Sequence, residues 1–162
     1  MNTWLEILKN NNYIGAKQYI KKGADLNDES DIGESVLAYA LRYRCDEELI
    51  KLLIEFGADI YDFDNEGVSI FDVAITYNNL FIIKYILQKG IDVNKTTRRS
   101  GFTPLMCASS YGQVEIAKLL LDKGANKETK DSKGFNAIDF ARKMNKKRML
   151  ELLVNYNIAP KK

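Results

Sequence analysis

Two cysteines and one run of carboxylates are the residues of this chain whose chemistry could support catalysis. Cys45 is followed by Asp46, Glu47 and Glu48, while Cys107 lies in an apolar stretch. A nucleophilic thiol needs a neighbouring base, and histidine most often supplies one near neutral pH. The 162 residues include no histidine, and two cysteines alone cannot complete an ordinary zinc site. We therefore expect no enzyme, no cofactor and no metal, with a reaction at Cys45 or at an acidic pair as the alternative.

Tyrosine recurs at a spacing that favours recognition instead. Tyr43, Tyr77 and Tyr111 are 34 residues apart, and Met144 follows after 33. Tyrosine is a preferred contact residue because it offers a large rigid apolar face and a hydroxyl group at low entropic cost. Packing of these rings between neighbouring helices is the alternative.

The elements that must position these side chains follow from the glycines. Eight of the ten glycines form two series with steps of 33 or 34 residues. One series is Gly23, Gly57, Gly90 and Gly124, and the other is Gly33, Gly67, Gly101 and Gly134. A period in the low thirties is typical of a solenoid, in which each unit buries its apolar face against its neighbours.

Helix-capping residues and apolar stripes recur with the same period as the two glycine series. A side chain that can cap a helix follows each glycine of the second series by two residues, namely Ser35, Ser69, Thr103 and Asn136. Thr3 with Glu6 repeats that arrangement and predicts a further start near the N-terminus. Apolar residues at helical spacing precede each glycine of the first series, as in Leu49, Leu52 and Leu53. Each unit is therefore predicted to hold two helices, and the fold to be all-α.

The segment Gly101-Phe102-Thr103-Pro104-Leu105-Met106-Cys107-Ala108, followed by Gly124-Ala125, resembles an ankyrin repeat. Weaker copies begin at Gly33, Gly67 and Gly134, so the resemblance covers almost the whole chain. It implies stacked helix pairs with projecting β-hairpin loops and a concave face made of hairpin tips and first helices. The chain departs from the family where a histidine usually follows Thr-Pro-Leu: Ala38, Asp72, Met106 and Asp139 stand there. One extra residue is also expected near Arg44-Cys45-Asp46, and another around Thr96-Thr97.

We predict one ankyrin-type solenoid domain of about five units over residues 1–162. Its parts are an N-terminal cap over 1–28, central repeats over 29–62, 63–96 and 97–130, and a C-terminal cap repeat over 131–162. Cys45 and Cys107 would lie at least two helix layers apart, so we expect free thiols, Cys107 in the core and Cys45 in an irregular, more reactive loop. No segment has the length and apolarity of a membrane span, and we expect an unprocessed, monomeric, cytoplasmic chain, or one delivered into a host cell.

The positions that the repeat leaves free predict where a partner binds. The residue after each glycine of the second series is Glu34, Val68, Phe102 or Phe135, and Phe63 extends that rim. With the tyrosine column, these residues predict a noncovalent protein-binding surface. The predicted contact residues are Tyr43, Tyr77, Tyr111, Met144, Val68, Phe102, Phe135, Phe63, Arg42, Glu34 and Arg99. The sequence is compatible with an inhibitor or immunity-type protein, with an adaptor and with an effector, and it does not distinguish among these roles.

Charge is distributed unevenly along the chain. Residues 1–96 contain 10 Lys and Arg against 16 Asp and Glu, whereas residues 97–162 contain 14 against 6. Such polarity steers a complementary partner and would also permit head-to-tail association. The basic last unit leaves nucleic-acid or phosphate binding as a further alternative, although no aromatic residues are interleaved with its basic ones in the sequence. A polar outer face on a terminal repeat explains the same charges.

Overall fold

The computed structural model describes residues 1–157, and these form ten helices and no strand. The helices are α1 (Asn2–Lys9), α2 (Tyr13–Lys21), α3 (Val36–Arg42), α4 (Glu47–Glu55), α5 (Ile70–Thr76), α6 (Leu80–Gln88), α7 (Pro104–Tyr111), α8 (Val114–Asp122), α9 (Ala137–Lys143) and α10 (Lys147–Asn155). We call the odd-numbered helices first helices and the even-numbered ones second helices. Each first helix joins its second helix through a short turn, and the predicted all-α repeat is confirmed.

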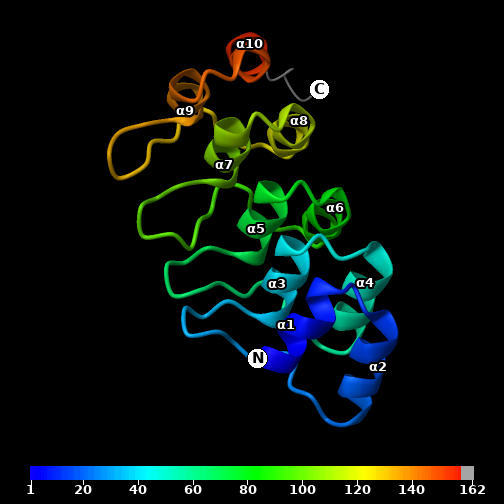
Figure 1. Cartoon of the computed structure of the whole chain (residues 1–162). Coiled ribbons are helices and arrows are strands. Elements are labelled where there is room, and N and C mark those ends of the chain that lie inside the picture. The colour runs from blue at the N-terminus through cyan, green and yellow to red at the C-terminus, as the bar shows by residue number, and fades with distance from the viewer. Residues whose placement is uncertain (158–162) are drawn as a thin grey trace. The chain divides into compact units, whose positions relative to one another are not determined.

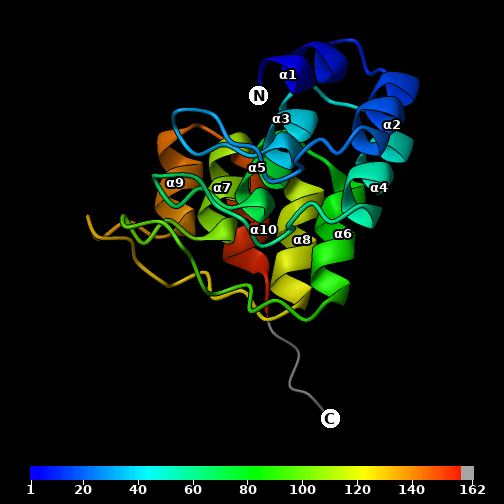
Figure 2. The same cartoon turned by 90° about the horizontal axis from the view of Figure 1, so that it is seen from below.

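The described chain divides into two compact units, Met1–Ile91 with α1 to α6 and a second unit that begins at Asp92 and holds α7 to α10. In unit 1, α3 packs against both α1 and α5, and α2 packs against α4. In unit 2, α7 packs against α9 and α8 against α10. Within each unit the long loops project from the side of the first helices, as Figures 1 and 2 show. The predicted single domain over 1–162 stays a prediction.

The predicted helix starts fall where the capping residues stand. The side chains of Ser35, Ser69, Thr103 and Asn136 each accept a hydrogen bond from a backbone N–H in the first turn of the following helix. Such bonds satisfy amides that would otherwise lack a partner. The further helix start predicted near the N-terminus is confirmed, but Thr3 does not cap it, because α1 already begins at Asn2 and has no side-chain cap.

Every first helix ends in the same way. The residue after its last turn adopts a left-handed conformation, with φ between 46° and 68°. These residues are Asn11, Arg44, Asn78, Gly112 and Asn145. Asparagine and glycine tolerate this conformation best, and it reverses the chain toward the second helix. The predicted extra residue lies in the turn 43–46, where Cys45 separates the left-handed residue from the cap of α4.

The loops that enter the first helices span residues 22–35, 56–69, 89–103 and 123–136, which we call loops 1 to 4. Loop 3 is one residue longer than the others, as predicted. Loops 1 and 2 each carry a single antiparallel bridge, Glu29 to Ser35 and Phe63 to Ser69. Their tips are joined because the Asn65 backbone N–H donates to the Ile32 carbonyl at 3.1 Å. In unit 2, Ser132 donates to the Ser100 carbonyl at 2.8 Å in the same manner.

The core of each unit lies between first and second helices. Leu49, Leu53, Ile82 and Ile86 are fully buried in unit 1. Ile116, Leu120, Met149 and Leu153 are fully buried in unit 2. These residues belong to the apolar stripes read from the sequence, and their burial is the main favourable term in stability. No helix in residues 1–157 has the length and apolarity needed to cross a membrane.

Candidate functional site

The column at the end of the first helices is open to solvent to different degrees. Tyr43 and Tyr77 are half-buried in unit 1, whereas Tyr111 and Met144 are 53% and 50% exposed in unit 2. Each side chain immediately precedes the left-handed residue of its repeat, so the backbone fixes its place at the helix end. The Tyr43 ring stacks on Tyr39 with centroids 6.0 Å apart, and the Lys9 ammonium lies 5.9 Å from the Tyr43 ring centroid.

The column after each glycine of the second series is not uniformly exposed. Val68 and Phe102 are half-buried and Phe135 is 41% exposed, but Glu34 is only 5% exposed. The expectation of an open Glu34 is therefore corrected. Its carboxylate forms a salt bridge with the Arg42 guanidinium two helical turns later, which accounts for its burial.

Arg42 is exposed, but its guanidinium is held by contacts with Glu34 and Tyr39, and we call these three residues a cluster. Its guanidinium lies 5.3 Å from the Tyr39 ring centroid as well as against Glu34. Burial, with the Glu34 carboxylate nearby, raises the pKa of the Tyr39 hydroxyl above its ordinary value. The cluster fixes loop 1 against α3, so Arg42 and Glu34 serve the fold in the free chain.

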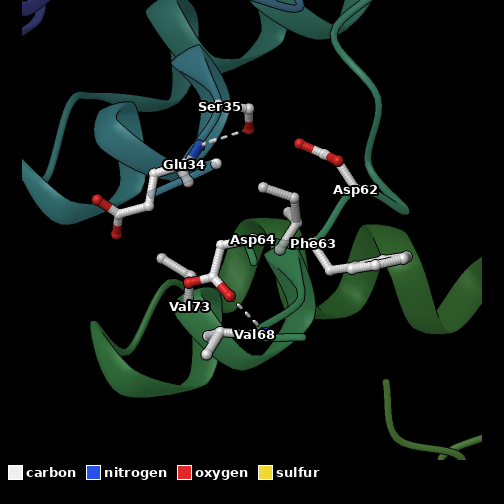
Figure 3. Close-up of a pocket in the computed structure, with 10 residues that line it drawn as sticks. Glu34, Ser35, Asp62, Phe63, Asp64, Val68 and Val73 are labelled. Atoms are coloured by element: carbon white, nitrogen blue, oxygen red, sulfur yellow. Dashed lines mark hydrogen bonds between the residues drawn. The ribbon is translucent and has the colours of Figure 1, made fainter. Parts of the chain in front are cut away.

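Phe63 is among the residues that line a small cavity between loops 1 and 2, and its side chain is 53% exposed. Figure 3 shows the ring pointing away from the Glu34 carboxylate, while Asp64 accepts a hydrogen bond from the Val68 N–H at 2.9 Å. Ile32 at the neighbouring loop tip is 56% exposed. Both loops of unit 1 therefore present apolar side chains to solvent.

Unit 2 contains an aromatic cluster that sequence reasoning only partly identified. Phe140 in α9 meets Phe102 edge-to-face at 5.0 Å between centroids, and Phe135 at 6.2 Å. The sequence did not single out Phe140, because Val73 and Cys107 occupy the same repeat position and are core residues. The half-buried state of Phe140 depends on its two loop neighbours, which lie in different repeats.

Basic side chains cover this aromatic cluster. The Arg98 guanidinium lies 4.8 Å from the Phe102 ring centroid, and the Lys143 ammonium lies 5.7 Å from the Phe135 centroid. Arg99 is exposed beside Arg98 at the tip of loop 3. An open groove next to the cluster is lined by Phe135, Asp139, Phe140, Arg142 and Lys143. Aromatic and basic side chains of unit 2 thus lie side by side in space, a contact that the reading of the sequence did not anticipate.

The structure confirms the prediction for Cys107 but not the one for Cys45. Both are free and buried, so Cys107 lies in the core as predicted. The reactive loop predicted at Cys45 is wrong, because this residue is only 4% exposed and its thiol donates to the Leu8 carbonyl. Burial, with a smaller contribution from Asp46, raises the pKa of the Cys45 thiol to about 11. Among residues 1–157 no group of three or more Cys, Asp and Glu side chains could hold a metal ion.

Comparison with known proteins identifies the repeat. The family model described as "Ankyrin repeats (many copies)" matches residues 71–121. The chain is 31% identical over 116 residues to the E3 ubiquitin-protein ligase Ufd4 of Drosophila melanogaster, covering 72% of this chain and 4% of that protein. It is 41% identical over 92 residues to the SMC5-SMC6 complex localization factor protein 1 of Homo sapiens, covering 57% of this chain and 9% of that protein.

A third relative, the delta-latroinsectotoxin-Lt1a of Latrodectus tredecimguttatus, is 40% identical over 83 residues, covering 50% of this chain and 7% of the toxin. The chain thus spans less than a tenth of each of these three proteins, whose names describe unrelated roles. The similarity lies in the repeats, and ankyrin repeats are in general noncatalytic modules for protein–protein interaction. The matched segment and the repeating helix pairs together identify this chain as a member of the ankyrin-repeat family.

Proposed function

We propose that this chain binds a protein partner noncovalently through its loop tips and the ends of its first helices. The observation that carries the proposal is the exposure of apolar side chains at those places. Tyr111 and Met144 at helix ends, and Phe63 and Phe135 on loops, are each at least 41% exposed. Burial in the framework of the repeat does not account for these exposed side chains, and organised apolar exposure is typical of interaction sites.

The proposed role is that of a scaffold that acts by occupancy, either as an inhibitor or as an adaptor. It includes no catalysis, and the burial of Cys45 speaks against the one alternative built on a thiol nucleophile. We also propose a reducing compartment such as the cytoplasm, where thiols stay unpaired, since both cysteines are free. We further propose that the chain is a monomer. The roles in the names of the relatives are not transferred, because the shared segment is a small part of each.

The experiment removes two members of the tyrosine column. A partner captured by the chain from its source cells is purified, and its affinity for Tyr77→Ala combined with Tyr111→Ala is measured by calorimetry. Each contact tyrosine contributes on the order of 2 kcal/mol, so the double variant should bind about 100-fold more weakly or worse. Its unfolding temperature should change little.

The matched control is Ile14→Ala combined with Val154→Ala. These residues are 69% and 58% exposed and lie on second helices, one in each unit. The control should keep the wild-type affinity. Unchanged affinity in the tyrosine variant, or a large drop in its unfolding temperature with normal affinity per folded molecule, would reject the surface.

A second candidate is nucleic-acid or phosphate binding by the basic unit 2, favoured by the cations around Phe102 and Phe135. Binding of this kind weakens steeply as salt rises, because neutralised phosphates release counterions. Gel retardation of single-stranded DNA and RNA at low salt tests it. If neither nucleic acid is retarded, this candidate is dismissed.

A further inference from the structure

The groove beside Phe135 and Phe140 combines an apolar floor with a basic border. The two rings meet edge-to-face and line the groove together with Arg142 and Lys143. Phe135 is 41% exposed, so an apolar side chain from outside can contact its ring without any rearrangement of the core. Arg142 and Lys143 are exposed at the end of α9, where their charges reach solvent.

Charge points to the kind of partner that fits this groove. The sequence from Asp92 onward carries 15 Lys and Arg against 7 Asp and Glu. Among residues 1–157, Lys143 forms no salt bridge, and Arg142 has only an exposed contact of 3.5 Å with Asp139. Exposed pairs of this kind contribute little, so both cations remain available to carboxylates of a partner.

We propose that this groove binds an acidic segment of a protein partner. An apolar side chain of the segment contacts Phe135 and Phe140, and its flanking carboxylates pair with Arg142 and Lys143. The proposal rests on the proposed protein-binding function and specifies the chemistry of the partner.

The aromatic geometry favours a peptide over a nucleic acid. Stacking of a base requires an open ring face. Arg98 already lies over the Phe102 ring, and the Phe140 ring is engaged by both neighbouring rings.

The experiment selects ligands from random sequences, so the natural partner need not be identified first. A displayed library of random 12-residue peptides is enriched on the full chain, and an enriched peptide is synthesised with a fluorophore. Its affinity is measured by anisotropy for the wild type, for Phe135→Ala and for Lys143→Glu. The control Lys118→Glu makes the same charge change on the exposed face of α8.

We expect the enriched peptides to be acidic and to share an apolar residue. Phe135→Ala and Lys143→Glu should each weaken binding at least about tenfold, while Lys118→Glu should stay within about twofold of the wild type. Thermal unfolding of each variant, together with its residual affinity per folded molecule, separates lost contacts from lost fold.

The inference is overturned by no enrichment, by enrichment of neutral or basic peptides, by equal affinity of all variants, or by stronger binding of an oligo(dT) of equal charge. Competition by the peptide with self-association of the chain would instead assign the groove to a second copy and also reject the proposal. If a captured protein partner is lost by the double tyrosine variant but retained by Lys143→Glu, only this inference fails. The proposed protein-binding function then stands.

Discussion

At the scale of single residues, the repeat pattern assigns residues to equivalent positions but does not determine which of them face solvent. Glu34 occupies the same repeat position as Phe135, yet the first is buried and the second is exposed. The difference lies in Arg42, whose guanidinium pairs with the Glu34 carboxylate. A repeat pattern assigns positions to a face, but the side-chain partners that draw a residue inward come from tertiary contacts.

The salt bridge between Glu34 and Arg42 predicts a stability effect. Arg42→Met should lower the free energy of unfolding by about 1–2 kcal/mol, because it leaves a buried carboxylate without its counter-charge, and the partial exposure of Arg42 reduces the loss. Urea unfolding at neutral pH measures it. Combining Arg42→Met with Glu34→Gln should recover part of the loss, and full stability in Arg42→Met alone would contradict the prediction.

The buried thiol of Cys45 predicts slow reactivity and a dependence on pH. An ordinary thiol ionises near pH 8.5, while burial raises the pKa of Cys45 to about 11 in the folded chain. Since only the unfolded thiol ionises between these values, its contribution is complete below about pH 8.5 and is lost as the pH rises toward 11.

Two measurements test this statement about Cys45. Ellman's reagent at pH 8 should label the thiols quickly only after denaturation. Wild type should lose about 2 kcal/mol more of its stability than Cys45→Ala between pH 8 and pH 11. Fast labelling of the folded chain that disappears in Cys45→Ala would show that the thiol is open.

At the scale of elements, capping chemistry explains why the boundaries of the first helices were predictable. In α5 the Ser69 side chain accepts from the Asp72 N–H at 3.1 Å, and the Asp72 carboxylate accepts from the Ser69 N–H at 3.1 Å. Asn136 and Asp139 form the same reciprocal pair in α9. Asp72 and Asp139 stand where the family usually has histidine, so these two repeats satisfy the helix start locally.

The Ser69 cap at the start of α5 is predicted to contribute measurably to stability. Ser69→Ala should lower the free energy of unfolding by about 1 kcal/mol, since it leaves an amide of the first turn unpaired. Ser110→Ala is the matched control, because that hydroxyl only donates to a carbonyl within α7 and should change stability little. Chemical denaturation measures the free energy of unfolding of both variants. Equal values for Ser69→Ala and Ser110→Ala would contradict the prediction.

The same elements show where sequence reasoning ends. The pattern Thr3-x-x-Glu6 looks like a cap, but α1 already contains both residues. The sequence did not reveal this because no glycine precedes the first unit to mark where its helix begins. The aromatic groove of unit 2 was missed for another reason. Phe102 and Phe140 come from different repeats, so their contact depends on how loop 3 meets α9 and not on any spacing within one repeat.

At the scale of the whole chain, opposite net charges characterise the two units. Residues 1–91 carry 9 Lys and Arg against 15 Asp and Glu, and the remaining residues carry a basic excess. A charged surface of this kind raises the rate of encounter with a complementary partner more than the final affinity. Partner association should therefore slow markedly as salt is raised, while dissociation changes less.

We predict a monomer in spite of this charge asymmetry. At about 0.15 M salt the screening length is about 8 Å, so attraction between unlike units of two molecules is largely screened. Static light scattering should give the monomer mass at this salt concentration and at about 0.5 M. A mass that grows with protein concentration and falls as salt is added would instead reveal head-to-tail association.

The left-handed residue after each first helix has a practical consequence. Because Asn11, Arg44, Asn78, Gly112 and Asn145 make the chain reverse, the side chain just before each of them is free from the task of ending the helix. Selection can therefore replace Tyr111 or Met144 without rebuilding the repeat beneath. If the proposed function holds, specificity can change through substitution of one such residue in one repeat, with the helix pairs left intact.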